Sequence, residues 1–338
     1  MDQRCRIEVV DRVSRLRTLV EPWTELWACA RFSTPFQHPG WILAFYDELR
    51  VQEPRILLLW KGKQLVMLAP FYLWKTGDRS TLVLAGNGVS DYLDILVRPA
   101  NQRSAATALG AFTANAEWEV ADLRDLDARA ALCRIPWPAT ANDSTFAEQG
   151  CPRLALPKRL DDALASVSRA IRRDLERAER QLSKMGALDV TVTDLTTLPA
   201  DYSQLVTLHT LRWQSAGSPG IFGTDYYRRF FLAAFTGLAR AGLLRLLTIR
   251  LDGKPIAVTC GFAQRRHYYH FITGYDPEWS SLSPGTLAVY VALRAAIHEG
   301  AVCFDFLRGK EAYKYRWGAQ DHPTYRRRLR PMRGSPGS

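Results

Sequence analysis

Over residues 21–50, aromatic residues recur at spacings of three to five, a pattern typical of amphipathic helices that dock on a sheet. Two runs rich in strand-forming residues, 55–60 and 64–74, flank Lys61-Gly62-Lys63 and predict a β-hairpin. The same patterning predicts further strands and helices, and this alternation is typical of an α/β first domain. The predicted strands are 81–85, 92–97 and 118–123, and the predicted helices are 103–115 and 124–134.

A proline-containing, polar segment at 135–152 predicts a connection, after which a long helix is expected from near Arg159 to Gly186. Apolar residues at spacings of three and four give this helix one continuous stripe: Leu164, Val167, Ile171, Leu175, Ala178 and Leu182. Beside it runs a second, basic stripe: Arg169, Arg173, Arg177, Arg180 and Lys184. Two interpretations stay open, a solvated helix face and one wall of an anion-binding groove.

The second half of the chain predicts strands joined by short turns, with Asp252-Gly253 as a strong hairpin signal. Its expected strands are 188–192, 243–251, 254–263, 267–274 and 302–307, and its expected helices are 199–213, 224–242 and a helix from Ser283 to Glu299. The predicted division is a first domain over 1–150, a connecting basic helix over 151–186, a second domain over 187–332 and a disordered tail over 333–338.

The run Val302–Leu307 reads as a short buried strand that is apolar except for Asp305. A buried carboxylate is costly unless it is paired or hydrogen-bonded, and the neighbouring candidates are Arg308, Tyr313 and Lys314. Functional sites in α/β folds gather at strand ends, so this segment is a candidate site. The alternative is a structural strand in which Asp305 is fully hydrogen-bonded and an exposed basic turn follows.

Charge is unevenly distributed along the chain, whose formal net charge is +11 over 338 residues. Residues 153–184 and 308–333 account for the whole excess. Localised positive charge attracts an anionic partner, for which the candidates are coenzyme A, a nucleotide-linked sugar, RNA and an anionic lipid surface.

Several classes of protein fit the sequence poorly. There is no P-loop, no GxSxG elbow and no GxGxxG after a strand. The six cysteines form no CxxC pair, and no His or Cys spacing suggests a metal site, so no catalytic metal is expected. Without a long apolar run or a signal-peptide pattern, a cytoplasmic location is expected.

The segment FDFLRGKEAYKYRWGA resembles the C-terminal signature of GNAT-like acyltransferases of the CelD (cellulose biosynthesis) group and, more distantly, the FemAB aminoacyltransferases. Those families show (F/Y)DFxxG followed by YKxxW. The segments TPFQHPGW, SDYLD and HxxRW add looser matches. The resemblance implies an α/β (α+β) fold of tandem GNAT-like domains, with mixed central sheets flanked by helices. It also implies transfer of an acyl group from an acyl-CoA, such as acetyl-CoA, to an amine acceptor in polysaccharide or cell-envelope biosynthesis.

The resemblance also implies where the donor binds. In GNAT enzymes a strand pairs with pantetheine and the following helix N-terminus receives the pyrophosphate. The corresponding residues here are Phe271, Thr273 and Gly274 in the strand and Ser283, Pro284, Gly285 and Thr286 at the helix start. Because SLSPGT replaces the usual RxxGxG/A loop, an aminoacyl-tRNA donor stays open beside CoA.

Acyl transfer requires a polarised carbonyl, a neutral amine and a stabilised leaving thiolate. The candidate acceptors of the amine's proton are Asp305, Tyr275 and Asp276, although an orienting role is favoured for Asp305. Tyr313 is the candidate for protonating the thiolate or orienting the substrate. The candidate substrate-binding residues are Arg212, Trp213, Arg308 and Lys314, the last expected to be exposed.

Two alternatives belong to other functional classes. A non-catalytic scaffold could use its basic stripes to dock on a membrane polysaccharide synthase or an anionic surface. An aminoacyl-tRNA-dependent transferase would bind nucleic acid, which is otherwise not expected. Asp305, Tyr313 and Lys314, together with Ser283-Pro284-Gly285-Thr286, favour an active enzyme.

Overall fold

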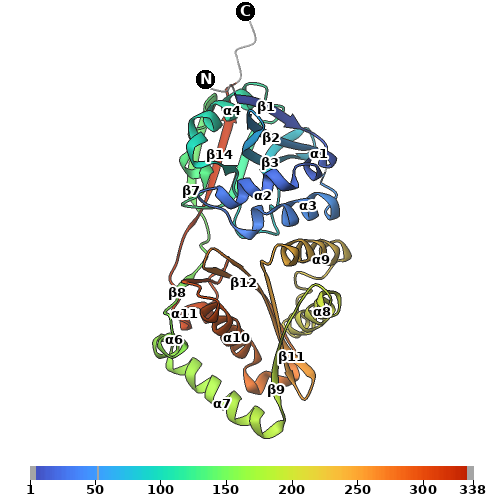
Figure 1. Cartoon of the computed structure of the whole chain (residues 1–338), viewed down its shortest axis with the longest axis vertical. Coiled ribbons are helices and arrows are strands. Elements are labelled where there is room, and N and C mark those ends of the chain that lie inside the picture. The colour runs from blue at the N-terminus through green and yellow to red at the C-terminus, as the bar shows by residue number, and fades with distance from the viewer. Residues whose placement is uncertain (1–4, 52, 333–338) are drawn as a thin grey trace, which may run out of the picture. The chain divides into compact units, whose positions relative to one another are not determined.

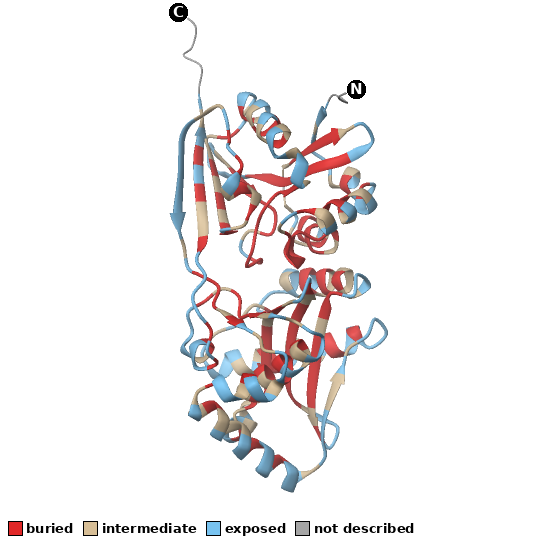
Figure 2. Ribbon diagram, turned by 60° about the vertical axis from the view of Figure 1, so that its left-hand side comes forward, coloured by how far each residue is buried: buried red, intermediate tan, exposed pale blue. Residues whose placement is uncertain are grey.

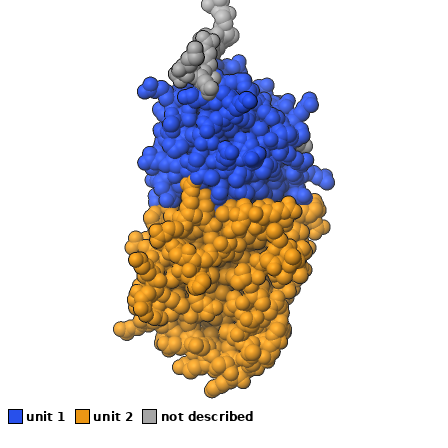
Figure 3. Space-filling view, viewed as in Figure 1, with its two compact units in different colours: residues 1–149, 323–338 blue, residues 150–322 orange. Residues whose placement is uncertain are grey.

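The computed structural model describes residues 5–51 and 53–332 (Figure 1). The chain divides into two compact units, residues 1–149 with 323–338 and residues 150–322 (Figure 3). The predicted disordered tail, 333–338, lies outside the described residues. No helix in the described ranges is long and apolar enough to cross a bilayer.

Unit 1 contains a mixed sheet whose strand order is β1-β2-β3-β4-β6-β14-β7, with β5 paired to β3. The predicted hairpin is confirmed, because Lys61 of β2 pairs with Gln64 of β3. The strands are β1 (Cys5–Val10), β2 (Pro54–Lys61), β3 (Gln64–Thr76), β4 (Arg79–Leu84), β5 (Leu96–Val97), β6 (Val120–Asp127), β7 (Thr140–Ala147) and β14 (Thr324–Pro331).

The helices of unit 1 include the two expected from the aromatic spacing, α2 (Val20–Cys29) and α3 (Pro39–Glu48). They place Trp23, Trp41 and Phe45 in the buried interior. The other helices are α1 (Val13–Arg17), α4 (Gln102–Ala114) and α5 (Ala131–Arg134), with short 3₁₀ turns at η1 (Pro35–Gln37) and η2 (Pro99–Asn101).

Unit 1 corrects three predictions. The expected helix at 124–134 begins as the end of strand β6, and only α5 is helical. The expected strand 92–97 is reduced to β5. The expected connection at 135–152 contains the polar, exposed strand β7, which pairs with β14 from the far end of the chain. No local pattern predicts β7, because its partner strand is remote in sequence.

Unit 2 contains a second mixed sheet in the order β8-β13-β12-β11-β10-β9. Only β12 and β13 run parallel, and they pair no further than Tyr269 with Asp305. Beyond this point the end of β12 has no strand neighbour on the β13 side within the described part of the chain. The strands are β8 (Arg153–Ala155), β9 (Leu188–Val192), β10 (Leu244–Leu251), β11 (Lys254–Gln264), β12 (His267–Tyr275) and β13 (Cys303–Asp305).

Helices cover both faces of this sheet (Figure 1). On one face α7 (Arg169–Met185) and α10 (Pro284–His298) pack against Leu247, Ile249 and Leu251 of β10. On the other, α9 (Asp225–Arg240) contributes a Phe cluster that meets Phe262 and Phe271. Figure 2 shows buried residues gathered on the central strands and exposed residues along α7. The remaining elements are α6 (Leu160–Ser166), α8 (Leu198–Ser215), η3 (Pro277–Leu282) and α11 (Ala312–Arg316).

The single long helix expected from Arg159 is instead two helices, α6 and α7. Val167 is extended, and the Ser168 hydroxyl accepts the Ile171 N–H at 3.4 Å, which starts a new helix. Residues 150–186 belong to unit 2, and β14 belongs to the sheet of unit 1. The predicted α/β architecture of mixed sheets flanked by helices is confirmed.

Candidate active site

A cavity of about 390 Å³ lies in unit 2 at the open end of β12. It brings together a large part of the predicted site, although the segments are far apart in sequence. Its lining comes from α7, α8, β12, η3, the start of α10, and α11 with the residue after it: Asp174, Arg212, Thr273, Tyr275, Ser280, Ser283, Pro284, Gly285, Thr286, Val289, Tyr313, Arg316 and Trp317.

The first turn of α10 presents fewer free amides than the sequence suggests. Pro284 has no N–H, and the Thr286 N–H donates to the carbonyl of Ser283 at 2.9 Å. Ser283 is left-handed, with φ of 50°. Among the described residues, the Gly285 N–H is therefore the one amide of this turn left without an acceptor. The helix start can offer one backbone donor to an anion, together with the positive end of its dipole.

The open edge of β12 offers backbone groups to the same space. The N–H of Asp276 donates to Ile256 of β11 at 3.1 Å. Successive residues of a strand direct their backbone groups to opposite neighbours, so Tyr275 and Thr273 face the side that β13 leaves open. On that side the Thr273 carbonyl accepts from Nη1 of Arg212 at 2.8 Å.

The cavity is rich in arginine. Cζ of Arg212 lies 5.3 Å from the centre of the Tyr275 ring, and neither Arg212 nor Arg316 has a carboxylate partner among the described residues. At the rim, Arg177 donates to the Ser283 hydroxyl at 3.0 Å and pairs with Asp174 at 3.1 Å. Two unneutralised guanidinium groups beside a helix N-terminus favour an anionic ligand.

Tyr313 is a further residue of the cavity lining. Its ring packs edge-on against Phe306 with centres 6.1 Å apart. Burial raises the pKa of Tyr313 to about 12; the Glu311 carboxylate adds to the effect and Arg212 opposes it. No described residue hydrogen-bonds to this hydroxyl. It therefore keeps its proton over the physiological range and can donate a hydrogen bond to a ligand.

His270 does not line the cavity, but it contacts Thr273, which does. Its Nε2 is 3.2 Å from the Thr273 hydroxyl, and its ring stacks on Phe304 with centres 5.4 Å apart. Burial, together with the charges of Lys314 and Arg212, lowers the pKa of His270 to about 3. A neutral imidazole in this place fixes the Thr273 side chain.

Asp305 does not line the cavity, and its partners differ from those expected. Its Oδ2 accepts from Nε of Arg153 in β8 at 2.8 Å, and its Oδ1 accepts from the N–H of Leu307 at 2.8 Å. Leu307 is left-handed, with φ of 58°. The buried carboxylate thus joins β13 to β8 and fixes the turn that follows. Arg153 was not among the expected partners, and the expected Tyr313 and Lys314 form no hydrogen bond or ion pair with Asp305.

We expect Asp305→Asn to lower the free energy of unfolding by about 2 kcal/mol, because an amide weakens the charged contact with Arg153. Denaturant unfolding of the variant measures this. Asp321→Asn, which alters an exposed carboxylate of the same unit, is the control and should stay within about 0.5 kcal/mol of wild type. Equal stability of both variants would show that the Arg153 contact contributes little.

Lys314 corrects a second expectation, because it is buried, with 2% of its surface exposed. Its ammonium donates to the carbonyls of Leu307, Arg308 and Gly309 at 3.1, 2.8 and 3.2 Å. It also lies 3.0 Å from a carboxylate oxygen of Glu311. The main chain and Glu311 use its donors, so the expectation that Lys314 is exposed is wrong.

Other predicted residues also lie outside the cavity lining. Phe271 packs among the rings of Phe231, Phe235 and Phe262. At Gly274 an added Cβ would lie 2.5 Å from the backbone nitrogen of His209, so this glycine lets α8 approach β12. Trp213 is partly exposed beside Arg212, and Arg308 contributes its carbonyl to Lys314.

The prediction missed three residues that the structure makes prominent. Arg316 lies inside the YKxxW signature, where the motif could have indicated it. Asp174 is an acidic residue directly after two arginines, and this context only weakly indicates a functional role. Arg153 lies 152 positions from Asp305, and the sequence holds no sign of that pairing.

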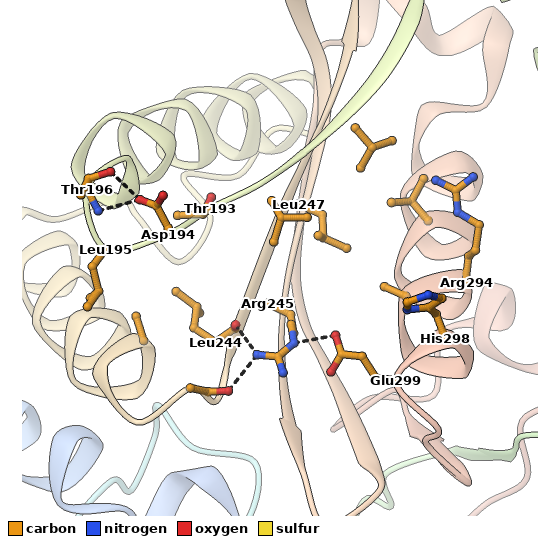
Figure 4. Close-up of a pocket in the computed structure, with 16 residues that line it drawn as sticks. Thr193, Asp194, Leu195, Thr196, Leu244, Arg245, Leu247, Arg294, His298 and Glu299 are labelled. Carbon is orange, nitrogen blue, oxygen red and sulfur yellow. Dashed lines mark hydrogen bonds and ion pairs between the residues drawn. The ribbon is translucent and has the colours of Figure 1, made fainter.

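A larger cavity of about 800 Å³ lies at the edge of β10, beside the second half of α10 (Figure 4). Its central polar groups satisfy one another, since Arg245 donates to Glu299 at 2.7 Å and to the carbonyls of Gly242 and Leu244. Asp194 accepts from Thr196. None of the predicted site residues lines it. The smaller cavity, which the predicted residues line, is therefore the candidate active site.

Comparison with known proteins supports the fold. Residues 169–315 match the family described as "Acetyltransferase (GNAT) domain". FemX is structurally similar, with TM-score 0.65 and 11% identity over 91% of this chain and 95% of that one. The C-terminal domain of a putative lysylphosphatidylglycerol synthetase from Agrobacterium fabrum has TM-score 0.58 and 12% identity over 94% and 92%. No curated protein matches significantly.

Most of unit 2 thus carries a GNAT-type acetyltransferase domain, and the expected GNAT fold is confirmed. L-PGS from Bacillus licheniformis is similar as well, with TM-score 0.55 and 10% identity over 91% of this chain and 90% of that chain. These likenesses concern the fold. Within the described residues, no three His, Cys, Asp or Glu side chains come together as a metal site.

Proposed function

We propose that the protein is an acyl-CoA-dependent N-acyltransferase whose active site is the cavity at the end of β12. One observation carries the proposal: the open strand edge, the Gly285 amide, two unneutralised arginines and the Tyr313 hydroxyl converge on one space. Acetyl-CoA is the simplest donor. Following the CelD-like resemblance, the acceptor is an amine on a precursor of a polysaccharide or of the cell envelope.

The donor would be held by groups of complementary chemistry. The positive end of α10 and the Gly285 N–H suit a pyrophosphate, and Arg316 adds a cation at the same wall. The open backbone of Thr273 and Tyr275 suits the amides of pantetheine. The thioester then lies near Tyr313, and the acceptor enters from the side of Asp174.

In the reaction the amine nitrogen attacks the thioester carbon, so a C–N bond forms and the C–S bond breaks. We assign Asp174, the one carboxylate among the described lining residues, to binding the acceptor amine and taking its proton. Tyr313 donates a hydrogen bond to the sulfur as negative charge develops there, and the departing thiolate is protonated by solvent. Asp305 holds the turn that precedes Tyr313.

A second candidate is an aminoacyl-tRNA donor, as the FemAB resemblance implies. The SLSPGT sequence favours it, because the first turn of α10 offers one free amide where a phosphate-cradling loop would offer several. Titration of the wild-type protein with CoA and with tRNA, by calorimetry at matched salt, separates the two. Heat from CoA alone supports the first candidate, and heat from tRNA alone supports the second.

We expect Gly285→Leu to weaken CoA binding at least tenfold. A Cβ at this position would lie 3.3 Å from Cε1 of Tyr275, so a larger side chain must extend into the cavity beside the free amide. Ala295→Leu is the control, since it places the same side chain on α10 but faces the other cavity. Unchanged CoA affinity in a folded Gly285→Leu protein would rule out this placement of the donor.

A further inference from the structure

Five cations of α7 occupy one face of the helix. At about 100° per residue, Arg169, Arg173, Arg177, Arg180 and Lys184 fall within an arc of about 80°. We call these five residues the α7 basic face. The acids of the helix, Asp174, Glu176 and Glu179, fall outside this arc. At 1.5 Å per residue the face is about 22 Å long.

The α7 basic face is exposed and largely unneutralised. All five side chains belong to exposed residues. Arg177 pairs with Asp174, but the other four have no carboxylate partner among the described residues. On the opposite side of the helix, Ile171, Ala178 and Leu182 are buried in the core of unit 2. The fold therefore fixes which side of α7 points to solvent (Figure 2).

Exposed apolar side chains follow directly at the end of the helix. Met185 is 52% exposed and Leu188 is 43% exposed, next to Lys184. Isolated exposed apolar residues are common, but here two of them follow a line of cations in the sequence, with Met185 about 80° round the helix from it. Cations attract anionic headgroups, and neighbouring apolar side chains can enter the boundary of the acyl chains.

We propose that the α7 basic face docks the protein on an anionic phospholipid surface. RNA has the same charge, but single-stranded RNA is bound largely by stacking on aromatic side chains, and α7 contains none. The phosphate backbone of RNA offers Met185 and Leu188 no apolar contact, whereas a bilayer can bury both side chains. Docking would bring the enzyme to an acceptor at the membrane, and this inference does not depend on the identity of the donor.

The test is sedimentation of the full chain with vesicles of equal parts phosphatidylglycerol and phosphatidylcholine, at low salt. The variant Arg173→Gln/Arg180→Gln/Lys184→Gln removes three cations and leaves Arg177, at the cavity rim, in place. The control Lys63→Gln/Arg79→Gln/Arg103→Gln removes three exposed cations of unit 1 and lowers the net charge equally. We expect the α7 variant to bind roughly a hundredfold more weakly, and the control to bind nearly as wild type.

The proposal is supported if wild type binds the vesicles, the α7 variant does not, and the control variant still does. Three outcomes would overturn it. In the first, wild type fails to sediment with anionic vesicles. In the second, both variants bind equally weakly, which indicates a general charge effect. In the third, wild type binds RNA but not vesicles and the α7 variant loses that RNA binding. CoA titration of the α7 variant should match wild type, and a lost CoA affinity would place these residues in the donor site.

Discussion

Replacing Tyr313 with phenylalanine is expected to lower kcat about a hundredfold, while the melting temperature changes by less than about 2 °C. The hydroxyl has no hydrogen-bond partner among the described residues, so its removal breaks no contact of the fold. In the proposed reaction it stabilises charge on the departing sulfur, and loss of one such donor typically costs two to three orders of magnitude in rate. Steady-state kinetics with acetyl-CoA and an amine acceptor measures the effect.

The pH dependence separates this role from that of a titrating acid. Burial raises the pKa of Tyr313 to about 12, so the group stays protonated in neutral and moderately alkaline solution. Wild-type activity should therefore show no alkaline loss from Tyr313 below about pH 11. Tyr315→Phe is the control, since Tyr315 is exposed and bonds Asp321. Full activity of Tyr313→Phe would contradict the assignment.

Lys314→Met is expected to lower the free energy of unfolding by about 3–5 kcal/mol and the melting temperature by roughly 10 °C. The variant leaves the carbonyls of Leu307, Arg308 and Gly309 without their shared donor in a buried turn. Guanidinium unfolding of the variant and wild type measures the loss.

Lys310→Met provides the matched control for Lys314. Lys310 lies in the same segment but is exposed, with an ion pair of 3.4 Å to Asp321. Exposed pairs contribute little, so this variant should unfold within about 1 kcal/mol of wild type. If both lysine variants had wild-type stability and only Lys314→Met lost activity, Lys314 would be a substrate-binding residue after all.

The sequence patterns predicted unit 2 well because its elements are specified locally. Strong alternation and the Asp252-Gly253 turn placed β9 to β12 within one or two residues of their observed ends. Unit 1 was harder to predict where a strand pairs with another strand that is far away in the sequence. Strand β7 is polar and exposed, and it exists through its pairing with β14, so no period along residues 140–147 reveals it.

The site residues divide in the same way, into those that a local motif specifies and those that depend on contacts remote in the sequence. Residues in short motifs, such as Gly285 and Tyr313, were predicted and do line the cavity. Roles that depend on burial could not be predicted from adjacency. Lys314 looks exposed in a polar turn, yet the chain folds three carbonyls around it. The partner of Asp305 comes from β8, because β13 lies between β8 and β12 in the sheet.

A crystal structure of the protein with bound CoA tests the central claim most directly. The account predicts the pyrophosphate at Ser283–Thr286 within hydrogen-bond distance of the Gly285 N–H. It also predicts pantetheine along Thr273 and Tyr275, and the sulfur near the Tyr313 hydroxyl. CoA bound in the larger cavity beside β10, or no CoA bound at saturating concentration, would contradict it.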